Sequence, residues 1–409
     1  MLIVFTISSI LVLLFEIIFL LVNASGMHWV LHVLLLSYGI IGSIVSIRKC
    51  VQNYKDNMKL EYESLGIKYL EGKGVKKDYN LAYNYFLKAS TYGSLESMYR
   101  IGQMYDNGYG FKQNYSKALE WYLKAGNLGY AKAQNAVGNM AENGEGCKQD
   151  LIKALDWYIL AAEQGNDLAR ENISGLKGKI DDDNLLIEGL NYYFGKDKEI
   201  NFDKAFAMVR RAAYLGNIES YLYLGEMYNY GRGTFLDNEK AFDYYLRSAE
   251  AGNALAMNRV GNAYLGGFGV EKDFKKAYEW YSKSASHGES AAYCNLGDMY
   301  SSGKYVKENE YKAFEYYLKA ANLGYVGAYF EVGYCFYYGK GVTRDYAKAV
   351  QWFNKGVKEN NANCEYGLGI CYLNGYGVSK NIALATNYLK KAADKGNKNA
   401  IDTIKEHNL

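Results

Sequence analysis

The sequence contains no proline, although average usage of about 5% would place roughly 20 in a chain of 409 residues. Nothing therefore interrupts helices, and turns must come from the 43 glycines. Histidine is also scarce, with four residues, so few side chains suit acid–base catalysis. The formal net charge of +3 is too balanced for a nucleic-acid-binding protein.

The first fifty residues are the one strongly apolar part of the chain. Residues 1–49 hold two stretches, about 2–22 and 27–47, each long enough to span a bilayer of about 30 Å, and we expect a transmembrane hairpin followed by a juxtamembrane linker at 50–60. Cations follow the second stretch, which places the repeats described below on the cytoplasmic side. Alternatively, a signal peptide is cleaved after Ala24. Glu16, His28 and His32 are the polar exceptions in this region, and their role stays open.

One glycine recurs along the rest of the chain. Successive copies are 36 residues apart, except for one gap of 51, and nine such units of constant period indicate a solenoid. Because glycine is unfavourable in a helix, we expect another helix to approach each copy closely. The nine copies are Gly66, Gly102, Gly138, Gly189, Gly225, Gly261, Gly297, Gly333 and Gly369.

Each unit reads as two helices, A and B, joined by a turn that in most units is Gly-x-Gly, with Asp197 in place of the second glycine in the fourth unit. An aspartate or asparagine follows the turn in all nine units, where its side chain can cap helix B. A large ring recurs in helix B, for example Trp121 and Trp280, between small residues. Helix B then ends at a glycine in eight units and at Asn360 in the eighth unit, because asparagine also tolerates the left-handed conformation.

These motifs resemble the Sel-1-like repeat, a relative of the tetratricopeptide repeat. The match is nearly complete from Gly261 to Gly288 and covers about residues 61–397. The resemblance implies an all-α fold, an α-solenoid of nine helix-turn-helix repeats in a right-handed superhelix, and a scaffold that binds other proteins. An insertion at 167–183 departs from the pattern, and residues 398–409 read as a C-terminal capping helix.

The six cysteines are expected to be free thiols. Cys364 and Cys371 are seven residues apart on one helix, about 10 Å, which exceeds the roughly 7 Å that a disulfide allows between Cα atoms. Cys335 and Cys371 occupy equivalent positions of neighbouring units, whose helices pack about 8 to 10 Å apart.

No catalytic motif is found. The chain has no nucleophile elbow, phosphate loop or zinc-type cysteine cluster, and the repeat accounts for its Gly-x-Gly elements as turns. We therefore expect no enzyme activity, no cofactor, no metal, and neither nucleic acid nor a small-molecule cofactor as a partner.

The resemblance also predicts where a partner binds, because helix A lines the concave face of tetratricopeptide-like solenoids. Two asparagine pairs on the outward side of helix A could hold an extended peptide through its backbone, and an apolar patch further along could anchor a side chain. Alternatively, this row is a solvated face whose aromatic end packs under the C-terminal cap. The predicted partner-binding residues are Asn135, Asn139, Asn258, Asn262, Phe330, Tyr334, Tyr337 and Tyr366.

The sequence thus predicts a membrane-anchored adaptor that presents a cytoplasmic repeat array to a protein or peptide partner. The alternative is an array on the far side of the membrane that engages the cell wall, a host protein or an enzyme partner. Fold class follows from the periodicity of the sequence, whereas the identity of the partner does not.

Overall fold

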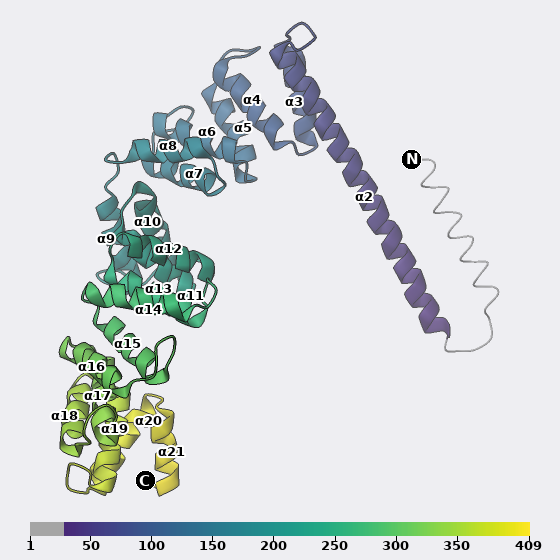
Figure 1. The fold of residues 1–409 in the computed structure, drawn as a ribbon. Coiled ribbons are helices and arrows are strands. Elements are labelled where there is room, and N and C mark those ends of the chain that lie inside the picture. The colour runs from purple at the N-terminus through teal and green to yellow at the C-terminus, as the bar shows by residue number, and fades with distance from the viewer. Residues whose placement is uncertain (1–27) are drawn as a thin grey trace. The chain divides into compact units, whose positions relative to one another are not determined.

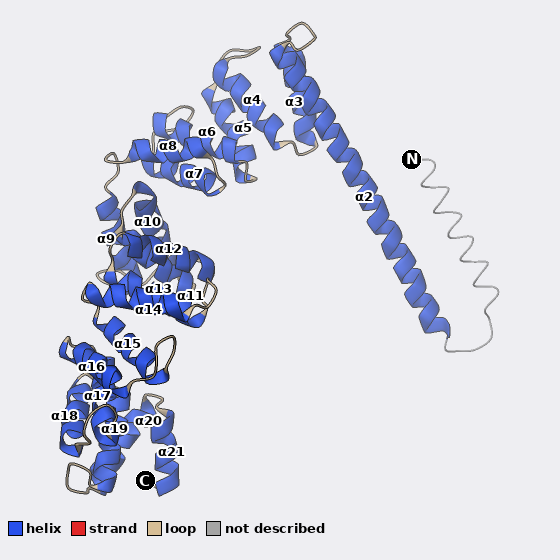
Figure 2. Cartoon of the chain, viewed as in Figure 1, coloured by secondary structure: helices blue, strands red, loops and turns tan. Residues whose placement is uncertain are grey.

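A computed structural model describes the backbone from residue 28 to residue 409, with side chains described from residue 45. Helices follow one another throughout this part, as the ribbon in Figure 1 and the blue helices in Figure 2 show. Within the described residues there is no strand, only an isolated bridge between Lys177 and Ile180. The predicted all-α solenoid is confirmed.

The chain divides into two compact units, Met1–Ile180 and Asp181–Leu409. In each unit, helices that follow one another in sequence pack together, and A helices alternate with B helices. The described helices of the first unit are α2 (His28–Glu71), α3 (Tyr79–Thr91), α4 (Leu95–Asn107), α5 (Tyr115–Asn127), α6 (Ala131–Asn143), α7 (Leu151–Glu163) and α8 (Asp167–Leu176). Those of the second unit are α9 (Asp182–Phe194), α10 (Phe202–Leu215), α11 (Glu219–Tyr230), α12 (Asn238–Glu250), α13 (Ala254–Gly266), α14 (Phe274–Ser286), α15 (Ser290–Ser302), α16 (Glu310–Asn322), α17 (Val326–Tyr338), α18 (Tyr346–Lys358), α19 (Ala362–Asn374), α20 (Ile382–Asp394) and α21 (Lys398–His407).

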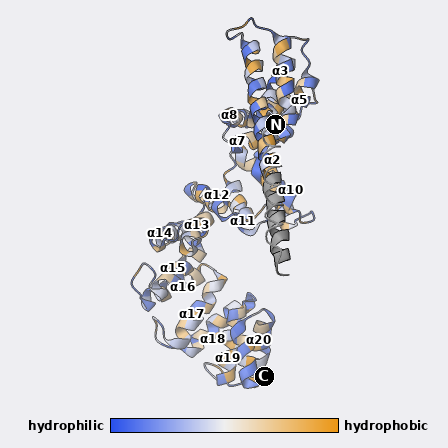
Figure 3. Cartoon of the chain, turned by 90° about the vertical axis from the view of Figure 1, so that its right-hand side faces the viewer, coloured by the Kyte–Doolittle hydropathy of each residue, from blue (hydrophilic) through white to orange (hydrophobic). Residues whose placement is uncertain are grey.

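Helix α2 is a single helix of 44 residues. It includes residues 50–60, expected to be a linker, and continues into the A helix of the first repeat. In the part with described side chains, hydrophobic and hydrophilic residues mix along the same helices (Figure 3), and no helix there is long and apolar enough to cross a membrane. The predicted transmembrane stretches, 2–22 and 27–47, lie outside that part except for residues 45–47.

The predicted helix caps are present in all nine repeats. In the second repeat, Asn114 Oδ1 accepts a hydrogen bond from the backbone N–H of Lys117 at 3.0 Å, which satisfies one of the free donors at the start of α5. Equivalent bonds are made by Asp78, Asp150, Asn201, Asp237, Asp273, Asn309, Asp345 and Asn381. Asn360, at the end of helix B in the eighth repeat, has φ of 62°, which confirms its expected left-handed conformation.

The close approach predicted at the helix-A glycines is also confirmed. A Cβ atom added to Gly261 would lie 2.5 Å from two carbons of the Tyr281 ring, so only glycine leaves room for the ring. The residue that covers each glycine lies 20 positions later and, except for Val209 after Met208, directly follows the recurring ring seen in the sequence. These residues are Phe86, Tyr122, Tyr158, Val209, Tyr245, Tyr281, Tyr317, Phe353 and Leu389.

The region expected to be an insertion contains a short helix, α8, which packs on α7 as the next A helix of an array would. Helix α21 at the end of the chain has the same length of 10 residues. Both helices are capped by an asparagine, Asn166 or Asn397, and neither is followed by a helix B that packs on it. Each unit therefore ends in a short capping helix, which covers the apolar end of its array.

The six cysteines are free thiols, as predicted. Cys50 is exposed and Cys147 is half-buried, while the other four are buried in the second unit. Burial raises the pKa of Cys335, Cys364 and Cys371 to about 12 each. These three thiols remain protonated at neutral pH and serve as core residues.

We predict that Gly261→Ala lowers the free energy of unfolding by about 1 to 3 kcal/mol, because its methyl group would force the Tyr281 ring out of position. Chemical denaturation of the full chain measures the change. Gly175→Ala is the control, since Gly175 lies in α8 with no atom within 4 Å of an added Cβ. An equal effect of the two substitutions would contradict the proposed role of Gly261.

Candidate functional site

The predicted partner-binding residues lie on one face of the A helices, along which hydrogen bonds join neighbouring A helices. Four positions on each helix recur on this face: three and two residues before the glycine, and one and four residues after it. We call the side chains at these positions the A row. Neighbouring A helices touch in the second unit, since α15 contacts α17 and α17 contacts α19.

The asparagine pairs of the A row are used inside the solenoid. In the second unit, Asn295 Nδ2 donates to Asn258 Oδ1 at 2.8 Å and lies 3.4 Å from Asn262 Oδ1. The first unit repeats this arrangement, with Asn172 Nδ2 at 2.9 Å from Asn135 Oδ1 and 3.0 Å from Asn139 Oδ1. One asparagine of the next A helix thus joins each pair to its neighbour.

The expectation that these asparagines offer free amides to a peptide is corrected for Asn135 and Asn258. Their residues are only 5% and 2% exposed, and their side-chain oxygens accept bonds from within the array. Asn139 and Asn262 are half-buried and also accept hydrogen bonds, from the hydroxyls of Tyr158 at 2.6 Å and Tyr281 at 2.8 Å. These carbonyl groups therefore stabilise the packing of neighbouring repeats.

Tyrosine hydroxyls reach the A row from the ring that covers each glycine. Tyr122 donates to Asp106 at 3.1 Å, and Tyr317 donates to Asp298 at 2.8 Å, in the same way as Tyr158 and Tyr281 do to their asparagines. Tyr245 is the exception, because its buried hydroxyl has no hydrogen-bond partner. Its expected acceptor, Glu226, instead accepts from Arg259 Nε at 2.7 Å.

Two carboxylates of the A row, Asp298 on α15 and Glu331 on α17, interact electrostatically. Glu331 on α17 is half-buried and makes no hydrogen bond or ion pair with any described residue. Burial, together with the negative charge of Asp298 on α15, raises the pKa of Glu331 to about 7. The pKa of Asp298 is also raised by loss of water around its carboxyl group, an effect that the Tyr317 hydroxyl and the charge of Lys304 partly offset. The negative charge at this junction therefore favours binding of a cation or protonation of Glu331.

Tyr334 and Tyr337 continue the A row beyond Glu331, and the ring of Tyr338, the next residue on α17, adjoins both of them. On α17, the rings of Tyr334 and Tyr338 lie 4.5 Å apart, and Tyr338 is 57% exposed. Tyr337 is enclosed by Tyr338 and two further rings, while Phe330 packs on Tyr334 and Phe353. Of the predicted apolar patch, Tyr334 thus lies beside an exposed ring, and Phe330 and Tyr337 mainly stabilise the fold.

Tyr366 has a different environment. It packs against Leu389, Ala392 and Ala400, in the cluster that α21 closes. This corresponds to the alternative interpretation of the patch, in which an aromatic residue lies under the C-terminal cap.

Sequence reasoning missed Arg259, Glu331 and Tyr338. The first two stand two residues before the glycine, at the position of Asn295, which reaches back to the preceding repeat. Comparing this position with its partners one repeat earlier could have revealed both the ion pair of Arg259 and the interaction between Glu331 and Asp298. Among the described residues, no group of three or more histidine, cysteine, aspartate or glutamate side chains is placed to hold a metal ion.

Comparison with known proteins identifies the repeat. The model of the Sel1 repeat matches nine segments: 64–93, 95–130, 131–166, 189–217, 218–253, 254–289, 290–325, 326–361 and 362–397. The chain belongs to the Sel1 repeat family. No match was found among curated proteins.

Solved structures resemble the chain over different shares of its length. A protective antigen present in uropathogenic Escherichia coli strains is 30% identical over 86% of this chain and 80% of its own, with a TM-score of 0.50. A Sel1 repeat protein from Oxalobacter formigenes is 22% identical over 88% and 91%, with a TM-score of 0.42. Cysteine-rich protein B from Helicobacter pylori is 30% identical over 32% and 95%, with a TM-score of 0.26.

We predict that Asn295→Ala lowers the free energy of unfolding by about 1 to 3 kcal/mol, because it leaves the buried Asn258 oxygen without its donor. Asn172→Ala should act similarly in the first unit. Thermal and chemical denaturation check both, with Asn322→Ala at an exposed position as the control. If all three variants unfold alike, the asparagine bonds do not couple neighbouring Sel1 repeats.

Glu331 should make stability depend on pH. A glutamate carboxyl has an ordinary pKa of 4.5, whereas the pKa of Glu331 in the folded chain is about 7. Between these two pH values the folded chain therefore binds more protons than the unfolded chain. The protonated carboxyl of Glu331 stabilises the fold fully below the unfolded pKa of 4.5, and this stabilisation is lost as the pH rises through the folded pKa of about 7. Denaturation of wild type and Glu331→Gln should therefore show a growing advantage of the variant from about pH 5 to about pH 8. Glu279→Gln, at an exposed position, should show no such trend.

Proposed function

We propose that the chain is a membrane-tethered scaffold that uses the A row of its Sel1 repeats to hold a protein partner on the cytoplasmic side. Sel1 repeat proteins are interaction scaffolds, and this proposal adds a site, an anchor and an orientation. The observation that carries the site is the electrostatic interaction between the carboxylates of Asp298 and Glu331, with the exposed ring of Tyr338 further along the same helix as Glu331.

The chemistry of this surface favours one kind of partner. A lysine or arginine side chain placed between Asp298 and Glu331 would relieve the repulsion between the two carboxylates. An apolar or aromatic side chain next to it could pack on Tyr338 and Tyr334, since exposed aromatic rings often anchor a partner. We infer that the partner segment carries a cation adjacent to an apolar residue.

The anchor and its orientation are supported by the sequence alone. Residues 2–22 and 27–47 are apolar and long enough to cross a bilayer, and Arg48, Lys49, Lys55 and Lys59 follow them. Helix α2 connects the second stretch directly to the first repeat, because it runs without a break from His28 to Glu71. The tether proposed here would thus be helical along its described length.

A second candidate places the array outside the cytoplasm, where it would engage the cell wall, a host protein or an enzyme partner. The likeness to a protective antigen of Escherichia coli favours it, since an antigen is recognised by a host. A pair of reporters fused after Leu409 distinguishes the candidates: one is active only in the cytoplasm and the other only after export. Activity of the exported reporter alone would overturn the cytoplasmic orientation.

We predict that Glu331→Gln and Tyr338→Ala each weaken partner binding by about tenfold, because each removes one of the two proposed contacts. The measurement is affinity capture by the full chain, followed by titration of the captured partner. Glu279→Gln and Tyr311→Ala are matched controls, since both alter exposed positions on B helices and Tyr311 is 62% exposed. Equal affinity of all four variants would place the partner elsewhere.

A further inference from the structure

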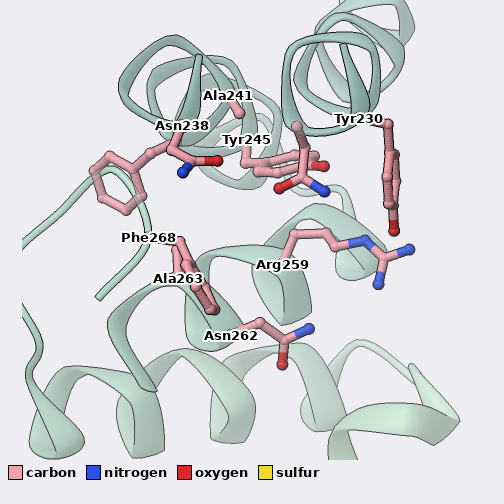
Figure 4. Close-up of a pocket in the computed structure, with 10 residues that line it drawn as sticks. Tyr230, Asn238, Ala241, Tyr245, Arg259, Asn262, Ala263 and Phe268 are labelled. Carbon is pink, nitrogen blue, oxygen red and sulfur yellow. The ribbon is translucent and has the colours of Figure 1, made fainter. Parts of the chain in front are cut away.

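A pocket of about 180 Å³ lies in the second unit, and Figure 4 shows Arg259 and Asn262 on one side of it. Both residues already serve the packing of the repeats, because Arg259 pairs with Glu226 and the Asn262 carbonyl accepts a hydrogen bond from Tyr281. A surface that no described residue covers lies instead on helix α2, outside the repeats.

Helix α2 extends far beyond the repeat to which its C-terminal end belongs (Figure 1). The next A helix, α4, begins at Leu95 shortly before Gly102, whereas α2 begins at His28, long before Gly66. Every residue from 45 to 55 is exposed. Because isolated short helices are marginal in water, such a segment is stabilised mainly when an apolar face packs against a partner.

The exposed segment has one apolar side. Four apolar residues, Ile47, Val51, Tyr54 and Met58, follow one another at spacings of four, three and four residues, which places them in one line along the helix. Ile47, Val51 and Tyr54 are 52%, 48% and 59% exposed, while Met58 is half-buried. The next position of the pattern is Glu61, which is exposed, so the apolar line ends at Met58. We call these four residues the α2 stripe.

The other sides of the segment are mainly polar. Gln52 Nε2 donates to Asp56 Oδ1 at 3.2 Å, and Lys59 Nζ lies 3.4 Å from the same oxygen. A helix that lies in a lipid surface needs a broad apolar face, whereas one apolar residue in every three or four suits the seam between two packed helices. The α2 stripe therefore fits a single helix as its partner.

The charges beside the α2 stripe favour a parallel pair of helices. With Val51 at position a of a heptad, the e positions carry cations and the g positions are uncharged. In a parallel pair each e residue faces a g residue of the other helix, so Lys55 of one copy would lie beside Cys50 of the other. An antiparallel pair would instead bring the e cations of two copies together. The e residues are Arg48 and Lys55, and the g residues are Ser43, Cys50 and Asn57.

A second copy of the chain is the partner that meets these conditions. It carries the same stripe with uncharged g positions, and two chains tethered through their N-terminal stretches in one membrane hold their α2 helices parallel and at the same height. Confinement of this kind raises the effective concentration of two short helices. The tether is part of the function proposed above, whereas the stripe and its flanking charges are independent of it.

We propose that two copies of this chain associate through residues 47–58 of α2 as a short parallel coiled coil, in which the two α2 stripes form the seam. The pair joins two repeat arrays, so that a partner with two binding segments can engage both A rows at once. Self-association through α2 is thus separate from the partner site proposed on the A helices of the second unit.

Disulfide crosslinking of the full chain in detergent solution tests the seam. Ile47→Cys and Tyr54→Cys, each in a Cys50→Ser background, should form covalent dimers on oxidation, since equivalent d positions face each other within the roughly 7 Å that a disulfide allows. Asn53→Cys in the same background is the control, because this exposed residue lies on the outer side of the helix and should give no dimer. An antiparallel pair aligns at most one of two positions a heptad apart, so crosslinking at only one of them would overturn the parallel orientation.

Sedimentation of the full chain measures the strength of association. Val51→Asp should weaken self-association by about tenfold, because it places a charge in the apolar seam. Asn53→Asp adds the same charge outside the seam and should associate as the wild type does. Thermal unfolding of the repeats should be unchanged in both variants, since both residues are exposed.

The proposal is overturned if the wild-type chain sediments as a monomer, if Val51→Asp and Asn53→Asp associate equally, or if Asn53→Cys crosslinks as well as Tyr54→Cys. Crosslinking of Tyr54→Cys to a different protein in cells, without a covalent dimer, would overturn the choice of a second copy. Because detergent solution needs no bilayer, failure of these tests would leave the proposed tether intact.

Discussion

The packing of a helix-B side chain against a helix-A glycine is the constraint on which the rest of this structure depends. At Gly261 the space between glycine and ring is too small for a single methyl group, so the distance between the two helices is fixed at that point. With the ring held there, its hydroxyl arrives at a defined place on the A row. The same contact therefore fixes both the distance between the two helices and the position of the tyrosine hydroxyl on the A row.

The position two residues before that glycine decides what each junction between repeats can do. Asn295 bridges two amides and completes a neutral network, whereas Arg259 forms an ion pair with Glu226. Glu331, at the same position one repeat later, interacts with the negative charge of Asp298. One register position thus determines whether a junction between repeats is neutral, ion-paired or acidic.

Much of the fold could be predicted from the sequence because it depends on local rules. The helix caps, the glycine contacts and the left-handed Asn360 all follow from residue type and spacing. The candidate site was harder to predict, because periodicity shows which way a side chain points but not what reaches it from the next repeat. Asn258, expected to be open to a partner, is instead buried and accepts a hydrogen bond from Asn295. Helix α8 could not be recognised from the repeat pattern either, because it packs as an A helix but has no helix B after it.

The glycine contacts also determine how the array can fold. Each covering residue lies 20 positions after its glycine, and the helices pack mainly on their neighbours in sequence. Loops of this length close at small entropic cost, so folding can begin at any repeat and extend one helix at a time. With so few contacts between distant parts of the sequence, the low contact order of each unit favours rapid folding despite the length of the chain.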